Sequence, residues 1–76
     1  MNKQAFLLEI REALEIETIL LEDTNLKELE EWDSMTAMML IGYVSEVFDT
    51  ELTPKDILNL TTVRSLILKI GEEKFR

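Results

Sequence analysis

The chain contains no cysteine and no histidine among its 76 residues. Without cysteine it can form no disulfide, and it has no thiol that could act as a nucleophile. Without histidine it lacks the commonest general base and the commonest metal ligand. We therefore predict that the protein is not an enzyme and holds no metal. The remaining classes are a binding module, a structural piece and a substrate of other proteins' enzymes.

Basic residues and long apolar runs are also scarce. Eight lysines and arginines stand against 16 acidic residues, a formal net charge of −8, which excludes nucleic acid as the expected partner because phosphate would be repelled. The longest uninterrupted apolar stretch, Ala37–Val44, is far shorter than the ~20 residues that span a membrane. Glu9 and Arg11 interrupt the apolar N-terminal segment, which is therefore not typical of a secretory signal. We expect a cytoplasmic protein with one small domain over residues 1–76.

Apolar residues recur at helical spacing in four segments, and no segment alternates as a convincing strand would. A first helix is expected over residues 3–16, with Asn2 as its cap, and a second over residues 34–48. Between them, residues 17–33 form a long connection that still carries six large apolar side chains. A loop this apolar must fold back over the core, and its TNLKEL stretch can add a helical turn.

Two further helices have recognisable start signals. Thr53 can cap a short third helix, with Pro54 at its first position and Asp56 where a capping box places its acid. A fourth helix is expected after Thr61–Thr62. The side chains expected to fill the core from these segments are Ile57, Leu58, Leu60, Val63, Leu66, Ile67 and Ile70. Residues that suit the last helix end are Gly71, Lys74 and Arg76. The predicted fold is all-α: a small bundle of three longer helices and one short helix.

The second helix is apolar on more than one side. Residues placed at 100° intervals give it a core face of Ala37, Ile41, Val44 and Phe48, flanked by Met38 and Leu40. Met35, Met39 and Tyr43 lie opposite this face, where a helix packed on one side should carry polar residues. One interpretation is that the 17–33 loop covers them. The other is an exposed, adaptable contact patch, since methionine suits surfaces that repack against partners.

The acidic segments do not fit a calcium loop or a pair of catalytic carboxylates. An EF-hand loop needs glycine at its sixth position, but a loop that starts at Asp23 has Glu28 there, and one that starts at Asp49 has Pro54. Glu30, Glu31 and Asp33 lie close together in sequence, but such a run is usually a solvated face rather than a cleft. These acids are therefore not predicted to be catalytic.

Ser34 follows Asp33 at the head of the apolar second helix, and a serine at a helix start is usually only a cap. Its surroundings, however, carry a wider pattern. WDSM at 32–35, VFDTEL at 47–52 and LTTVRSLILKI at 60–70 follow the apolar TNLKEL loop in order. Together these stretches resemble the acyl carrier protein family over nearly the whole chain. The Asp-Ser motif alone is weak, and the four features in order are strong.

The resemblance implies that a separate transferase esterifies Ser34 with 4′-phosphopantetheine, with Asp33 as its motif neighbour. The thiol of that group would carry acyl groups as thioesters for fatty-acid or polyketide biosynthesis. The implied partners are a phosphopantetheinyl transferase, an acyl-loading ligase or synthase, and acyl-transferring or condensing enzymes, which would meet a monomeric carrier. A phosphodiester at a helix N-terminus also faces free backbone N–H groups and the positive end of the helix dipole.

Some positions depart from the pattern of fatty-acid carriers. Thr36, Met39 and Ser45 stand where acids are common along the second helix, and only Glu46 remains. This favours dedicated partners over a general fatty-acid synthase, and the predicted partner-binding residues are Met35, Met39, Tyr43 and Glu46. Asp33 before the serine favours an acyl carrier. The alternatives are an aminoacyl or peptidyl carrier of the same fold and a helical interaction module that is never modified.

Overall fold

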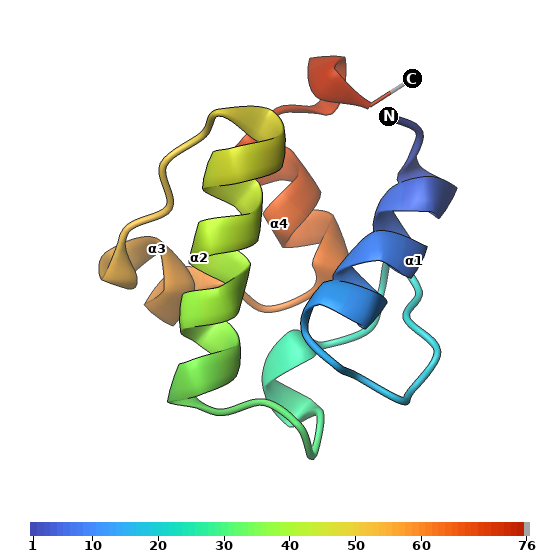
Figure 1. The fold of residues 1–76 in the computed structure, drawn as a ribbon, viewed down its shortest axis with the longest axis vertical. Coiled ribbons are helices and arrows are strands. Elements are labelled where there is room, and N and C mark those ends of the chain that lie inside the picture. The colour runs from blue at the N-terminus through green and yellow to red at the C-terminus, as the bar shows by residue number, and fades with distance from the viewer. Residues whose placement is uncertain (76) are drawn as a thin grey trace.

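The computed structural model describes residues 1–75, in which four α-helices are joined by loops (Figure 1). The helices are α1 (Lys3–Ala13), α2 (Ser34–Phe48), α3 (Pro54–Asn59) and α4 (Val63–Ile70), with 3-10 turns η1 (Leu26–Glu28) and η2 (Glu72–Lys74). Within this described range there is no β-strand, and one isolated bridge pairs Asn25 with Thr62. The predicted all-α fold is confirmed, including η1 within TNLKEL. Arg76 lies outside the described residues.

Each α-helix begins with a side-chain cap. The capping residues are Asn2, Asp33, Thr53 and Thr62, and each accepts a hydrogen bond from the backbone N–H three residues later. At Thr53 the predicted capping box is complete, because the Asp56 carboxylate accepts the Thr53 N–H at 3.0 Å in return. A cap of this kind stabilises a helix by about 1 kcal/mol, so all four helix starts are locally encoded.

Helix α1 ends at Ala13, so the predicted end at residue 16 is wrong. Glu15 adopts a left-handed conformation with φ of 55°, and its N–H donates to the Glu12 carbonyl at 3.2 Å. The Ile16 N–H donates to the Arg11 carbonyl at 2.9 Å. This pair of bonds is a Schellman motif, which reverses the chain and buries the Ile16 side chain.

The core forms where α1, α2 and α4 meet and is completed by the long first loop. Helix α4 contributes Val63, Leu66, Ile67 and Ile70, all buried as predicted. From α3 only Ile57 is buried, whereas Leu58 is 75% exposed, so its predicted place in the core is wrong. Leu58 faces outward because α3 has only six residues, and Ile57 takes its one inward position.

The first loop folds over the core, as its composition predicts. Leu20 and Leu26 are buried, while Leu29 and Trp32 are half-buried against the core. Backbone bonds tie this loop to the start of α4: the N–H of Leu26 donates to the Thr61 carbonyl at 2.8 Å. The loop is therefore part of the packed structure, and it delivers the chain to the start of α2 (Figure 1).

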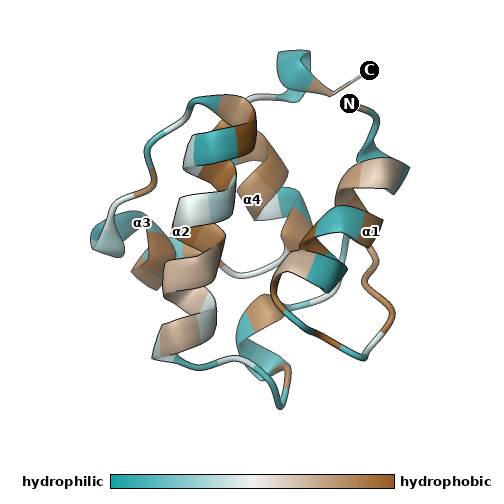
Figure 2. Cartoon of the chain, viewed as in Figure 1, coloured by the Kyte–Doolittle hydropathy of each residue, from teal (hydrophilic) through white to brown (hydrophobic). Residues whose placement is uncertain are grey.

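Helix α2 is rotated relative to the predicted core face. Its buried residues are Thr36, Leu40 and Val44, whereas Ala37, Ile41 and Phe48 are only half-buried. The wheel could not fix the orientation because apolar residues surround the first turns of this helix, which are coloured brown to tan in Figure 2. In residues 1–75 no helix, this one included, has the length and apolar character needed to cross a bilayer.

The predicted exposed patch on α2 is wrong for two of its three residues. Met39 and Tyr43 are half-buried and pack against the core. Tyr43 lies 6.3 Å from Phe6 between ring centroids, and its hydroxyl donates to Glu9 of α1 at 2.9 Å. Burial and the Glu9 carboxylate both raise the Tyr43 pKa. Helix α1 therefore covers Tyr43.

Candidate functional site

Ser34 is the first residue of α2 and is exposed to solvent. The residue that caps the helix is Asp33, whose backbone is extended and whose side chain accepts from the Thr36 N–H. A capping role for Ser34 is therefore wrong, and its hydroxyl is not needed to satisfy the helix end. The N–H groups of the first helical residues have no partner within an α-helix, and the Asp33 carboxylate accepts the one of Thr36.

The Asp33 carboxylate is engaged beside this serine. Its Oδ1 lies 2.8 Å from the Thr36 backbone N and 3.0 Å from the Thr36 Oγ1. These donors lower the Asp33 pKa, the backbone bond having the largest effect. Asp33 is therefore ionised at neutral pH and serves as a hydrogen-bond acceptor for the helix start.

The segment before Ser34 is held at a second point. The Glu31 carbonyl accepts the Thr36 hydroxyl at 2.8 Å, and a Glu31 carboxylate oxygen accepts the Glu17 N–H at 2.9 Å. The bond from Glu17 is the main reason that the Glu31 pKa is lowered. The turn that leads into α2 is thus fixed to both α2 and the segment after α1.

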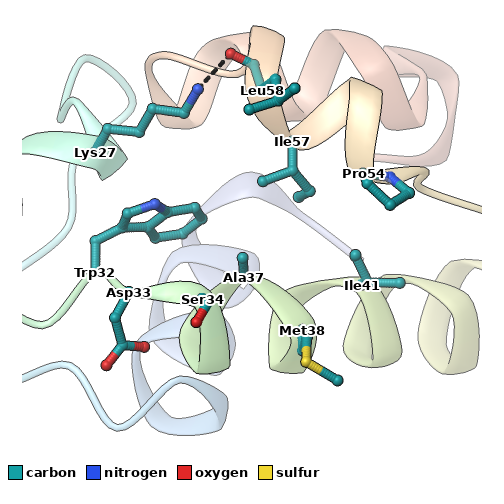
Figure 3. A pocket seen from close by; sticks show the side chains of 10 residues that line it. All are labelled: Lys27, Trp32, Asp33, Ser34, Ala37, Met38, Ile41, Pro54, Ile57 and Leu58. Carbon is teal, nitrogen blue, oxygen red and sulfur yellow. Dashed lines mark hydrogen bonds between the residues drawn. The ribbon is translucent and has the colours of Figure 1, made fainter.

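A groove of about 500 Å³ runs between α2 and α3 beside Ser34 (Figure 3). Its apolar lining residues are Trp32, Ala37, Met38, Ile41, Pro54, Ile57 and Leu58, and Lys27, Asp33 and Ser34 complete it. In Figure 3 the Trp32 indole lies across the gap from Ile57, while the Asp33 carboxylate points away from it. The Lys27 ammonium donates to the Leu58 carbonyl and joins η1 to α3.

This arrangement can present a hydroxyl but has little means of activating it. The chain has no histidine or cysteine, and the adjacent Asp33 carboxylate is engaged by Thr36. The site therefore suits a serine that is modified by an enzyme and not one that acts as a nucleophile on its own.

The predicted partner-binding residues do not form one surface. Met35 is 69% exposed next to Ser34, and Glu46 is exposed near the far end of α2. Met39 and Tyr43 are half-buried against the core, and Tyr43 contacts Glu9 of α1. Met38, predicted beside the core face, is instead 71% exposed and lines the groove, so that expectation is wrong. Site roles were not predicted for Trp32, Leu58 or Thr36 either. Of these, only Trp32 had a signal, through its place in WDSM.

Comparison with known families agrees with this geometry. The family described as phosphopantetheine attachment site matches residues 4–70, which includes all four α-helices except the first residue of α1. Searches of curated proteins and of solved structures returned no significant match. Domains of the matching family carry covalently attached 4′-phosphopantetheine and are generally non-catalytic carriers. The chain therefore belongs to the phosphopantetheine attachment site family and is a phosphopantetheine carrier protein.

Proposed function

We propose that this carrier holds 4′-phosphopantetheine on Ser34 and uses it as an acyl carrier protein. The observation that carries the proposal is the position of Ser34: an exposed hydroxyl on the first turn of α2, directly after Asp33, in a chain of this family. Residues 1–76 would act as one carrier domain in the cytoplasm. The group's thiol would supply the thioester chemistry that the chain's own residues lack.

The attachment step is a transfer from coenzyme A. The Ser34 Oγ forms a bond to the phosphorus that bears pantetheine, and the P–O bond to the second phosphate of the pyrophosphate breaks. Adenosine 3′,5′-bisphosphate leaves with the bonding electrons, and the serine proton passes to a base of the transferase. The chain contributes the hydroxyl, and the positive end of the α2 dipole favours the negative phosphodiester.

Three features support an acyl carrier with dedicated partners. Asp33 before the serine is typical of acyl carriers, and the groove beside Ser34 is lined mainly by apolar side chains. Helix α2 has no acidic residue in its first turn and only Glu46 along its length. Partners that read a row of acids would find little to bind here. An aminoacyl or peptidyl carrier and an unmodified interaction module are the alternatives that the experiment must separate.

The test is modification of the whole protein by a broad-specificity phosphopantetheinyl transferase with coenzyme A, followed by intact mass. The wild type should gain the mass of one phosphopantetheine. Ser34→Ala should gain nothing, and it should remain folded because Asp33, not Ser34, provides the cap that is worth about 1 kcal/mol. Ser45→Ala is the matched control, because Ser45 is also an exposed serine of α2. A wild type that never gains mass favours the unmodified module, and a modified Ser34→Ala refutes the site.

The class of cargo needs a second assay on the modified protein. Incubation with acyl-loading and with aminoacyl-loading ligases should give a thioester mass with the acyl substrates. Loading with amino acids alone would favour the aminoacyl carrier and contradict the acyl assignment.

A further inference from the structure

Thr36 differs from every other polar residue that the structure describes, because its side chain is buried, with 4% of its surface exposed. It lies two residues after Ser34, on the first turn of α2. Burial of a hydroxyl is unfavourable unless hydrogen bonds compensate for the lost water. A valine of nearly the same shape would fill this position without that cost. The role of the Thr36 hydroxyl therefore depends on the groups to which it is hydrogen-bonded.

Those groups lie on both sides of Asp33 along the chain. The Thr36 Oγ1 lies 2.8 Å from the Glu31 carbonyl oxygen and 3.0 Å from the Asp33 Oδ1, so its proton can be donated to either. The Thr36 backbone N–H donates to the same Asp33 oxygen at 2.8 Å. Thr36, two residues after Ser34, is thus hydrogen-bonded to Asp33, the residue immediately before Ser34, and to Glu31 in the preceding turn. These bonds enclose Ser34 in a short closed ring.

The far end of this ring is anchored as well. The Glu31 carboxylate accepts the Glu17 N–H, and the Arg11 guanidinium donates to the carbonyls of Glu17 and Thr18. Helix α1 is therefore connected to the start of α2 through a series of hydrogen bonds that ends at Thr36. If the Thr36 hydroxyl were removed, the Glu31 carbonyl would lose its link to α2, and the turn that carries Asp33 could shift relative to the helix.

We propose that Thr36 is a positioning residue for the modification of Ser34: its hydroxyl fixes the 31–33 turn and so holds the serine hydroxyl in the orientation that a transferase requires. This inference rests on the proposed function of Ser34. Thr36 does not itself need to touch the transferase, because it is buried. The expected effect is on the rate of transfer after docking, since a misplacement of about 1 Å at a reacting group can slow a reaction by about 100-fold.

The experiment compares initial rates of modification by one transferase, with the concentration of the carrier varied to separate kcat from KM. Thr36→Val keeps the shape and the backbone N–H but removes the hydroxyl. It should lower kcat by roughly tenfold or more and leave the KM for the carrier unchanged. Thr36→Ser restores the hydroxyl without the methyl group and should restore kcat.

Ser65 offers a matched control at the start of α4. Its hydroxyl donates to the Thr62 carbonyl at 2.6 Å, and its N–H donates to the capping Thr62 side chain, as Thr36 does with the cap of α2. Ser65→Ala removes an equivalent hydroxyl away from Ser34 and should leave kcat at the wild-type value. Denaturant melts of all variants show which of them remain folded.

The outcomes separate this inference from the function on which it rests. A Thr36→Val protein that is folded and modified at the wild-type kcat overturns the positioning role and leaves Ser34 as the site. A raised KM with unchanged kcat also overturns it, because the effect would then be on docking. Should Thr36→Val not fold, Thr36→Ala, which also lacks the hydroxyl, replaces it, and equal kcat values for Thr36→Ala and Thr36→Ser again refute the proposal. A wild type that is never modified refutes both.

Discussion

Two adjacent methionines test how α2 is oriented in the protein. Met38 is 71% exposed in the groove, whereas Met39 is half-buried against the core. We consider the substitution of each by glutamate, which makes the same change in charge and side-chain size one residue apart. Any difference between the two variants must therefore come from the environment of each position.

The expected difference follows from burial. Complete burial of a methionine side chain stabilises a protein by ~1.5–3 kcal/mol, and a glutamate in a partly buried position also loses solvation of its charge. Met39→Glu should therefore lower the free energy of unfolding by about 2–3 kcal/mol. Met38→Glu should change it by less than about 0.5 kcal/mol, as is usual for an exposed position.

Urea melts followed by far-ultraviolet circular dichroism measure both values. With a slope of about 1 kcal/mol per molar urea for a chain of this size, the midpoint should fall by roughly 2 M for Met39→Glu and by less than about 0.5 M for Met38→Glu. Equal shifts, or a larger shift for Met38→Glu, would refute the orientation of α2 and with it the assignment of Met38 to the groove.

Three other predictions concern acid, glycine and salt. Backbone N–H groups lower the pKa of Glu31 below its ordinary value of 4.5 and the pKa values of Asp33 and Asp56 below 3.8. The ionised carboxylates therefore stabilise the fold fully above these ordinary values, and the stabilisation is lost as the pH falls through the lower pKa values of the folded protein. The melting temperature should drop below about pH 4, and a flat profile there would contradict this. In a urea melt, Gly42→Ala should stabilise the protein by about 0.5–1 kcal/mol because the added methyl group meets no atom within 4 Å. Gly71→Ala should destabilise it by about 1 kcal/mol or more because Gly71 has a φ of 116°, and the opposite order of the two effects would disprove this reasoning. Because the formal net charge is −8, monovalent salt and especially divalent cations should raise the melting temperature, and a flat or falling value would count against self-repulsion.

The parts of the fold that were predictable are those with local signals of their own. The starts of α1 and α3 could be predicted without tertiary information because their side chains hydrogen-bond the adjacent backbone. These side chains are Asn2 for α1 and Thr53 and Asp56 for α3. Helix α4 has Val63, Leu66, Ile67 and Ile70 at helical spacing, which was enough to assign its core face. Ser34 was predicted as the attachment site from its motif and from the order of the segments around it, and this assignment stays a prediction.

The parts that were not predictable depend on packing between elements. The first turns of α2 carry apolar residues on most sides, so only packing against the core decides that Met39 is covered and Met38 is not. Helix α1 ends where Glu15 adopts a left-handed conformation that is usually occupied by glycine, so the sequence contained no signal for this helix end. The burial of Thr36 is a tertiary effect as well, because its hydroxyl donates to the Glu31 carbonyl in a turn whose conformation could not be predicted from the sequence.

The position of Trp32 has a practical consequence. It is the only tryptophan in the chain, and its half-buried indole lies in the groove that begins at Ser34. Indole emission depends on how much water surrounds the ring, so the protein contains an optical reporter at the place where a group joined to Ser34 begins. If Ser34 carries the group, its addition by a transferase with coenzyme A should change this emission, which can be followed continuously without a label, with Ser34→Ala as the blank.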